Sequence, residues 1–329
     1  MKPLLDIQDL AIDFDTKAGI VQAVDGISFQ VFPGEIVGIV GESGCGKSVT
    51  AHGIMKLINT PPGRYGKGKI LFQGRDLLQL GEEEMGKIRG NEISMIFQDP
   101  MTALNPVLRI GLQITESLQY HLGLSKKAAQ ARAIEILRLV GIPAPEQRIR
   151  DYPHQFSGGM RQRAIIAIAL ACEPTLLLAD EPTTALDVTI QAQILTLLKD
   201  LQRKQNMSII FISHDLGAVA ELCDRVMVMY AGKIVEAGTA FDIFHNPRHP
   251  YTEGLLQSVP RLDVGQKQKL TVIDGQPPDL LHRPPGCPFH PRCSYAMKIC
   301  ACQYPEDTEL TPSHRVNCWL QHPGAPSRR

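Results

Sequence analysis

The sequence predicts an α/β domain with a mostly parallel sheet, followed by a smaller module of different composition. Short apolar runs alternate with helical patterns through about the first 250 residues. A glycine-rich segment stands between one of these runs and the next helical pattern. From Pro247 onward, prolines break up any long element and cysteines gather. The first two observations predict the fold class, and the third predicts the appended module.

The composition fits a globular protein with a sizeable core and excludes several other classes. Of 329 residues, 43% are hydrophobic and 21% are charged, which argues against disorder. Lys plus Arg and Asp plus Glu both number 34, so no net charge attracts the chain to nucleic acid or anionic lipid. The longest apolar run covers only residues 164–172, whereas a membrane-spanning helix needs about 20 residues. Because Asp6 interrupts the start of the chain before a secretory signal can form, we expect a protein of the reducing cytosol.

Short apolar runs predict the strands. Four of them have the composition of buried parallel strands, namely residues 35–41, 93–97, 176–179 and 208–212. Residues 226–230 and 233–236 flank Ala231 and Gly232, which predicts a β-hairpin.

Two segments have the periodicity of amphipathic helices. Residues 125–140 begin with Ser125, which suits an N-cap, and Gly141 follows as a stop signal. Residues 189–205 form the second helix. Its expected apolar face consists of Ile190, Ile194, Leu197, Leu198 and Leu201.

Residues 41–48 match the phosphate-loop pattern G-x-x-x-x-G-K-[ST]. They directly follow a predicted strand, and residues 49–57 can form the helix that such a loop requires, which disfavours a chance glycine-rich turn. Glycines let backbone N–H groups surround phosphate oxygens, and the helix N-terminus adds a favourable dipole. Lys47 would contact the β- and γ-phosphates of ATP, and the Ser48 hydroxyl would bind Mg²⁺. The expected nucleotide contacts are Gly41, Ser43, Gly44, Cys45, Gly46, Lys47, Ser48 and Val49.

Two adjacent acids end the predicted strand at residues 176–179. A buried strand can place Asp180 beside Mg²⁺ and Glu181 beside an attacking water, and a hydrolase needs both tasks done. The alternative is a strand followed by a solvated acidic turn. The presence of a phosphate loop in the same chain disfavours this alternative.

Ser157, Gly158 and Gly159 precede an apolar helical pattern. Taken alone, they are either an anion-binding helix start or an ordinary cap. Because they stand between the phosphate loop and the acidic pair, the chain resembles the ATP-binding subunits of ABC transporters over residues 1 to about 245. Residues 184–187 match the D-loop of that family.

The resemblance implies the roles of the site residues. Asp180 matches the Walker B acid, and Glu181 matches the catalytic glutamate that follows it. Gln98 matches the Q-loop and His214 the switch histidine, so Glu181, Gln98 and His214 are the expected catalytic residues. Ser48, Gln98 and Asp180 would bind Mg²⁺.

Two further contacts to ATP follow from the resemblance. Phe14 is the candidate aromatic residue for stacking on adenine. Ser157, Gly158 and Gly159 would close over ATP bound to a partner subunit, so that ATP joins two subunits and hydrolysis separates them. The usual LSGGQ signature is FSGGM here; the serine and both glycines are retained, so we expect a competent signature.

Five of the eight cysteines lie in residues 287–318, which points to metal or cluster binding before disulfides. The spacing C-x5-C-x6-C lacks the close pairs of a zinc ribbon, whereas four thiolates can bind a [4Fe–4S] cluster. Together with residues 248–252, this region resembles the C-terminal extension of the dipeptide, oligopeptide and nickel importers, in which four cysteines are associated with such a cluster. The implied ligands are Cys287, Cys293, Cys300 and Cys318. Zinc and unmetallated thiols remain alternatives, and Cys302 is extra to the pattern and could compete with Cys300.

The resemblance implies an ABC ATP-binding domain over residues 1–247, with a helical subdomain at about 99–160, and an extension over residues 248–329. The expected function is ATP hydrolysis that energises peptide import at the cytoplasmic face of a bacterial inner membrane. The implied partners are a second homologous ATPase in a heterodimer, two permease subunits and an extracytoplasmic solute-binding protein, without nucleic acid. Nickel or another small solute is an alternative cargo. A soluble ABC-type ATPase acting on nucleic acid or ribosomes is the alternative of another class.

Overall fold

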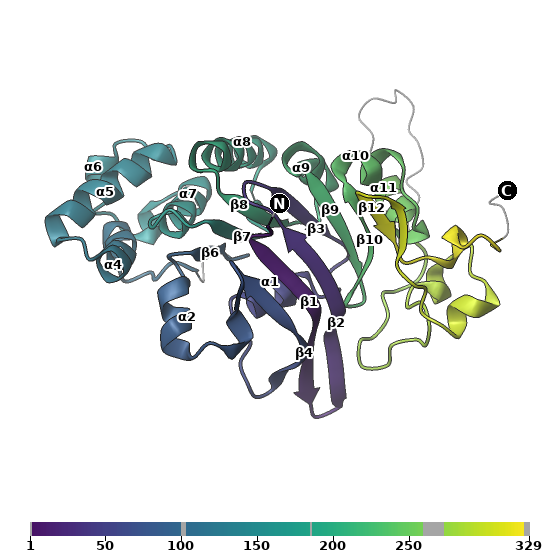
Figure 1. Ribbon diagram of the computed structural model, residues 1–329. Coiled ribbons are helices and arrows are strands. Elements are labelled where there is room, and N and C mark those ends of the chain that lie inside the picture. The colour runs from purple at the N-terminus through teal and green to yellow at the C-terminus, as the bar shows by residue number, and fades with distance from the viewer. Residues whose placement is uncertain (1, 100–102, 185, 259–272, 326–329) are drawn as a thin grey trace, which may run out of the picture. The chain divides into compact units, whose positions relative to one another are not determined.

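The computed structural model describes residues 2–99, 103–184, 186–258 and 273–325 (Figure 1). The chain divides into two compact units. Unit 1 comprises residues 1–4, 31–36 and 76–212. Unit 2 comprises residues 5–30, 37–75 and 213–329. Within the described residues, no helix has the length and apolar character needed to cross a membrane.

Unit 1 is built on a parallel sheet, as predicted. Its strands β6 (Ile93–Ile96), β7 (Leu176–Asp180) and β8 (Ser208–Ile212) pair in that order and are buried along their whole length. Continuous apolar strands of this kind are typical of a sheet covered on both faces. The helices of the unit are α2 (Glu82–Ile88), α4 (Ile110–Leu122), α5 (Lys126–Leu139), α6 (Pro145–Arg148), α7 (Gly158–Ala169) and α8 (Val188–Gln205).

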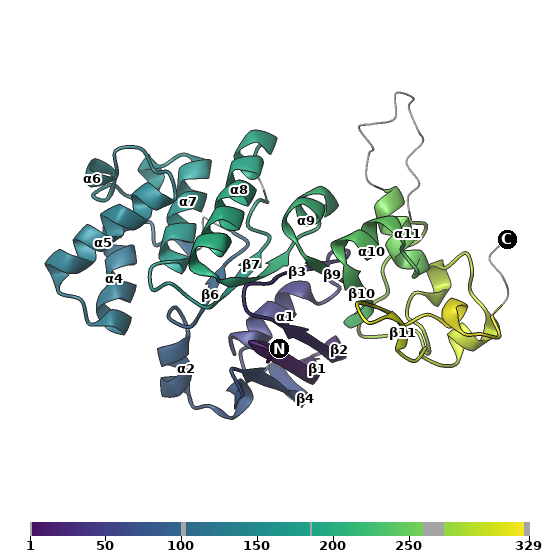
Figure 2. The ribbon, with the colours of Figure 1, turned by 45° about the horizontal axis from the view of Figure 1, so that its top comes forward.

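Both helices predicted from periodicity lie in unit 1. The Ser125 hydroxyl caps α5 by accepting from the N–H of Ala128 at 3.3 Å, and Gly141 follows the helix with φ +76°. α8 is capped by Asp187 and buries Ile194, Leu195, Leu198 and Leu201. α4, α5 and α7 pack against one another (Figure 2). α4 and α5 lie within the expected helical subdomain at about 99–160, whereas α7 extends to Ala169; the bounds of that subdomain stay a prediction.

Unit 2 contains a sheet that the sequence analysis did not anticipate. β1 (Leu5–Thr16), β2 (Gly19–Val31), β4 (Gly63–Phe72) and β5 (Arg75–Asp76) have the order β2-β1-β4-β5, and β1 is antiparallel to β4. At the start of β1, buried Leu5 and Ile7 alternate with more exposed Asp6 and Gln8. That alternation is the signal of a strand with one solvated face.

Unit 2 also contains β3 (Ile36–Val40), which is parallel to β9 (Arg225–Tyr230). The predicted hairpin is confirmed, because β9 is antiparallel to β10 (Lys233–Thr239). Its turn residues Ala231 and Gly232 have φ +48° and +80°, as a two-residue hairpin with the right twist requires. The helices α1 (Lys47–Ile54), α9 (Leu216–Leu222), α10 (Ala240–His245) and α11 (Pro250–Gln257) complete this part of the unit.

The proline-rich extension contributes two strands beside β10. β12 (His314–Val316) pairs with β10 and with β11 (Thr308–Thr311). Beside this pairing, the Glu236 carboxylate is buried and accepts from the N–H groups of Arg248 and His249 at 2.7 and 2.9 Å. His314 Nε2 donates to the same carboxylate at 2.8 Å. The extension therefore shares a compact unit with the phosphate loop, and the expected boundary at residues 247 and 248 stays a prediction.

Candidate functional site

The predicted phosphate loop lies between β3 and α1, and two of its glycines are required by close packing. A Cβ on Gly41, which has φ +152°, would lie 2.2 Å from the Met229 carbonyl oxygen. A Cβ on Gly46, with φ +106°, would lie 2.3 Å from the Ala23 carbonyl oxygen. Gly44 also has positive φ, +78°, but a Cβ there would meet no atom within 4 Å. The loop is thus held on one side and open at Gly44, where a ligand can approach the backbone.

Lys47 is the first residue of α1, and its side chain turns back over the loop. Its Nζ donates to the carbonyl oxygens of Gly41 and Glu42 at 2.8 and 2.9 Å, and the residue is only 5% exposed. Ser48 and Val49 follow in the first turn and are half-buried. Burial raises the pKa of the Cys45 thiol, so this side chain is neutral and packs as a small apolar group. Ser43 is exposed beside Gly44.

Phe14 lies on β1, also in unit 2, and is half-buried. Two residues before it, Ile12 packs so closely against α1 that a Cβ on Gly53 would lie 2.4 Å from its Cδ1. Side chains two positions apart on a strand share a face. The Phe14 ring is therefore on the α1 face of β1, which is compatible with an adenine contact.

In unit 1, the structure brings the side chains of Gln98 and Glu181 together, and their catalytic roles stay a prediction. Gln98 Nε2 donates to Glu181 Oε2 at 3.0 Å, and Thr184 Oγ1 donates to the same oxygen at 2.9 Å. Asp180 ends β7 and is 1% exposed.

The backbone of Glu181 is unusual for a residue other than glycine. Its φ is +48°, and its N–H donates to the carbonyl oxygen of Ile212 at 2.9 Å. A left-handed conformation at such a residue is uncommon and concentrates at functional sites. Sequence reasoning gave no sign of this conformation.

The predicted signature begins a helix of unit 1. Ser157 is the N-cap of α7, and its hydroxyl accepts from the N–H of Met160 at 3.3 Å. Ser157 and Gly158 are exposed, and a Cβ on Gly158 would meet no atom within 4 Å, so this helix start is accessible to an anion. Gly159 lies closer to α8, since a Cβ there would be 3.1 Å from Ile190. Phe156 is buried, so the first departure from the usual signature is a packing position.

The remaining predicted residues are placed as follows. His214 belongs to unit 2, where it is exposed and directly precedes Asp215, the N-cap of α9. Thr184 and Asp187 of the expected D-loop lie in unit 1, and Ala185 lies outside the described residues. The predicted site residues therefore form two groups, one in each unit.

The four cysteines predicted as ligands line one small cavity in the extension. Cys287, Cys293, Cys300 and Cys318 share it with aromatic and proline side chains, whereas Cys302 is exposed and lies outside its lining. Burial raises the pKa of the Cys287 thiol to about 11, so metal binding there must displace a proton. Across the described residues, no group of three or more His, Cys, Asp or Glu side chains is arranged closely enough to hold a metal ion.

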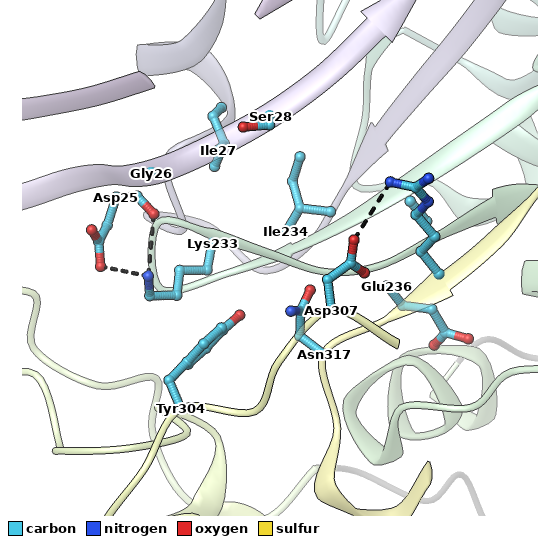
Figure 3. A pocket seen from close by; sticks show the side chains of 12 residues that line it. Asp25, Gly26, Ile27, Ser28, Lys233, Ile234, Glu236, Tyr304, Asp307 and Asn317 are labelled. Carbon is cyan, nitrogen blue, oxygen red and sulfur yellow. Dashed lines mark hydrogen bonds and ion pairs between the residues drawn. The ribbon is translucent and has the colours of Figure 1, made fainter. Parts of the chain in front are cut away.

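A larger cavity of 270 Å³ lies where the extension meets β2 and β10 (Figure 3). Asp25 forms an ion pair with Lys233 at 2.8 Å and a second one with Arg283 at 2.5 Å. Lys233 also lies over the Tyr304 ring, 4.5 Å from its centroid. These contacts tie the extension to the hairpin and to β2.

Comparison with protein families identifies two regions of the chain. Residues 24–184 match the family described as ABC transporter. Residues 235–300 match the family described as oligopeptide/dipeptide transporter, C-terminal region.

Individual relatives match over almost the whole chain. The oligopeptide transport ATP-binding protein OppD of Bacillus subtilis is 59% identical over 98% of this chain and 90% of that protein. The dipeptide transport ATP-binding protein DppD of the same organism is 58% identical over 98% of this chain and 96% of that protein. Among solved structures, a bacterial ABC transporter cassette in dimeric form aligns with TM-score 0.65 and 27% identity, covering 72% of this chain and 98% of that one.

Proposed function

Because the chain belongs to the ATP-binding proteins of ABC transporters, we propose that its ATPase activity energises the import of dipeptides or oligopeptides through separate permease subunits. The match of residues 235–300 to the C-terminal region of oligopeptide and dipeptide transporters supports peptides as the cargo. The reaction is ATP + H₂O → ADP + phosphate, coupled to inward transport.

The chemistry rests on the phosphate loop and on the pair formed by Gln98 and Glu181. The backbone N–H groups near Gly44 and the Lys47 ammonium would bind the phosphates, and Phe14 would stack on adenine. Ser48, Gln98 and Asp180 would bind Mg²⁺, because their side chains carry the oxygen ligands that this ion prefers. Glu181, oriented by Gln98 and Thr184, would polarise the attacking water, and His214 would contact the γ-phosphate region.

The signature at Ser157 would act on ATP held by a second, homologous ATPase subunit. Its exposed helix start supports this role, because unsatisfied N–H groups and the helix dipole favour a phosphate there. The other partners are two permease subunits and an extracytoplasmic solute-binding protein. We place the protein at the cytoplasmic face of the bacterial inner membrane.

Transport by the reconstituted assembly tests the cargo. Proteoliposomes containing both ATPases, both permeases and the binding protein should accumulate a labelled oligopeptide only when ATP is supplied on the ATPase side. Labelled nickel, offered under the same conditions, should not accumulate. Uptake of nickel without uptake of peptide would replace the proposed cargo and keep the ATPase role.

We also propose that the extension binds a [4Fe–4S] cluster through Cys287, Cys293, Cys300 and Cys318. Their shared, mostly apolar cavity supports the proposal, and thiolates are the ligands that such clusters use. The cluster would act as a structural staple or a redox sensor, because ATP hydrolysis requires no electron transfer. To bind it, the four thiols would have to change their arrangement and lose their protons.

Anaerobic purification should yield a brown protein with about four iron and four sulfide per chain. Cys293→Ser should abolish the colour and most of the iron. Cys302→Ser is the matched control, because Cys302 is exposed and outside the cavity; it should keep both. Zinc in place of iron, in anaerobically prepared protein, would reject the cluster.

A further inference from the structure

We propose that Arg292 of the C-terminal extension positions the phosphate loop through Glu42, so that the extension sets the affinity of the loop for ATP. The inference rests on the proposed nucleotide site and adds a positioning residue to it. The phosphate-loop motif leaves position 42 unrestricted, and Arg292 is 250 residues away in the chain.

Arg292 uses its whole guanidinium group in this region of unit 2. Nη1 and Nη2 donate to the two carboxylate oxygens of Glu42 at 2.6 and 2.9 Å, which is the bidentate geometry that gives the strongest ion pairs. Nε and Nη2 also donate to the carbonyl oxygens of Asp274 and Ile273 at 3.0 and 3.3 Å. Nη1 further donates to the Tyr230 hydroxyl at 3.4 Å. The side chain is only 6% exposed, and hydrogen bonding to Glu42 raises the pKa of Arg292 above its ordinary value.

A second residue of the same region holds the backbone of Glu42. The N–H of Glu42 donates to the Tyr251 hydroxyl at 2.8 Å. Tyr251 is fully buried, and its ring packs against Tyr230 and Phe289 with centroid separations of 4.5 and 5.3 Å. Glu42 is thus fixed at its side chain by Arg292 and at its N–H by Tyr251.

The position of Glu42 matters because its carbonyl oxygen faces the functional groups of the loop. This oxygen accepts from Lys47 Nζ at 2.9 Å and from the Cys45 N–H at 3.4 Å. A shift of Glu42 would therefore move the Lys47 ammonium and change the curvature of the loop at the same time. Both contribute to binding phosphate before any chemistry occurs.

The position of Arg292 depends in turn on the cysteine-lined cavity. Arg292 ends the 3₁₀ helix His290–Arg292, which lies between Cys287 and Cys293. The N–H of His290 donates to the Cys287 carbonyl oxygen at 3.0 Å, and that of Cys293 donates to the His290 carbonyl oxygen at 3.3 Å. This short segment connects the cavity lining directly to the guanidinium group that binds Glu42.

The test compares variants of the full-length chain in binding a fluorescent ATP analogue with Mg²⁺. Arg292→Gln should raise the dissociation constant by about five- to twentyfold, because a partly buried bidentate ion pair is lost. Arg292→Lys should fall between Gln and the parent, because it keeps the charge but not the paired donors. Arg315→Gln is the matched control, because Arg315 is half-exposed and pairs with Asp307 and Glu309 in the same extension. The Arg315→Gln variant should bind the ATP analogue with the affinity of the parent.

Three further readouts separate positioning from general loosening of the fold. In the assembled transporter, Arg292→Gln should raise KM for ATP and leave kcat within about twofold, because the loop binds ground state and transition state alike. Glu42→Gln leaves the extension itself unchanged and should weaken ATP binding to a similar degree. The double variant should be no weaker than the worse single variant, since both remove one interaction.

An Arg292→Gln protein that binds ATP as the parent does would overturn the inference, as would independent effects of the two substitutions in the double variant. Absence of ATP binding by the parent itself would instead contradict the proposed function. If Arg292→Gln fails to fold, Glu42→Gln with parental affinity would still overturn the inference.

Discussion

Glu181→Gln is expected to slow ATP hydrolysis by about 10²- to 10⁴-fold while ATP binding remains intact. The amide has nearly the shape of the carboxylate, so it can still accept from Gln98 Nε2 and Thr184 Oγ1. It cannot polarise or deprotonate water as a carboxylate does. The loss should therefore fall on the chemical step alone, and ATP-dependent association with the partner ATPase should persist.

Phosphate release in single-turnover and steady-state assays of the assembled complex measures this effect. Glu83→Gln provides a matched control, because Glu83 is an exposed residue of α2 in the same unit that pairs with Lys87. The control should retain parental turnover. Near-parental turnover of Glu181→Gln would remove Glu181 from the catalytic role.

The strands of unit 1 were predictable because each carries its signal locally. β6, β7 and β8 are short, apolar and buried throughout. Asp180 ends β7, and Glu181 follows it directly. The hairpin of β9 and β10 was equally local, because Ala231 and Gly232 form its turn. The long strands β1, β2 and β4 were not predicted, because they contain no continuous apolar run like those of β6, β7 and β8. The alternation of buried and exposed residues at the start of β1 was the available signal.

The contacts of the extension could not be predicted from local patterns. Prolines correctly indicated short elements, but they gave no sign that β12 would pair with β10. Glu42 occupies an unrestricted position of its motif, and no periodicity links it to Arg292. The left-handed backbone of Glu181 was hidden for a related reason, since composition suggests such a conformation at glycine or asparagine and not at glutamate.

Lys47 and Glu181 should also respond differently to substitution, because the role proposed for Lys47 is in binding and that for Glu181 is in chemistry. In the proposed reaction, Lys47 and its loop would contact phosphate in the ground state, whereas Glu181 would contact the water that reacts. Substitutions at these two residues should consequently separate affinity from turnover in one set of measurements.

Lys47→Ala is expected to weaken ATP binding itself by about 10- to 100-fold, in contrast to Glu181→Gln. The substitution removes the hydrogen bonds that Nζ donates to the carbonyl oxygens of Gly41 and Glu42, and it would remove the proposed charge-assisted contact to the phosphates. Calorimetric titration of the full-length chain with ATP and Mg²⁺ measures the change, and Lys69→Ala, at an exposed position of β4, is the matched control. Because a disordered loop would also lower affinity, the titration is repeated with adenosine, which lacks phosphates. If Lys47 acts through phosphate, Lys47→Ala and the parent should bind adenosine with the same affinity. Equal affinity of the two proteins for ATP would reject the phosphate-loop assignment.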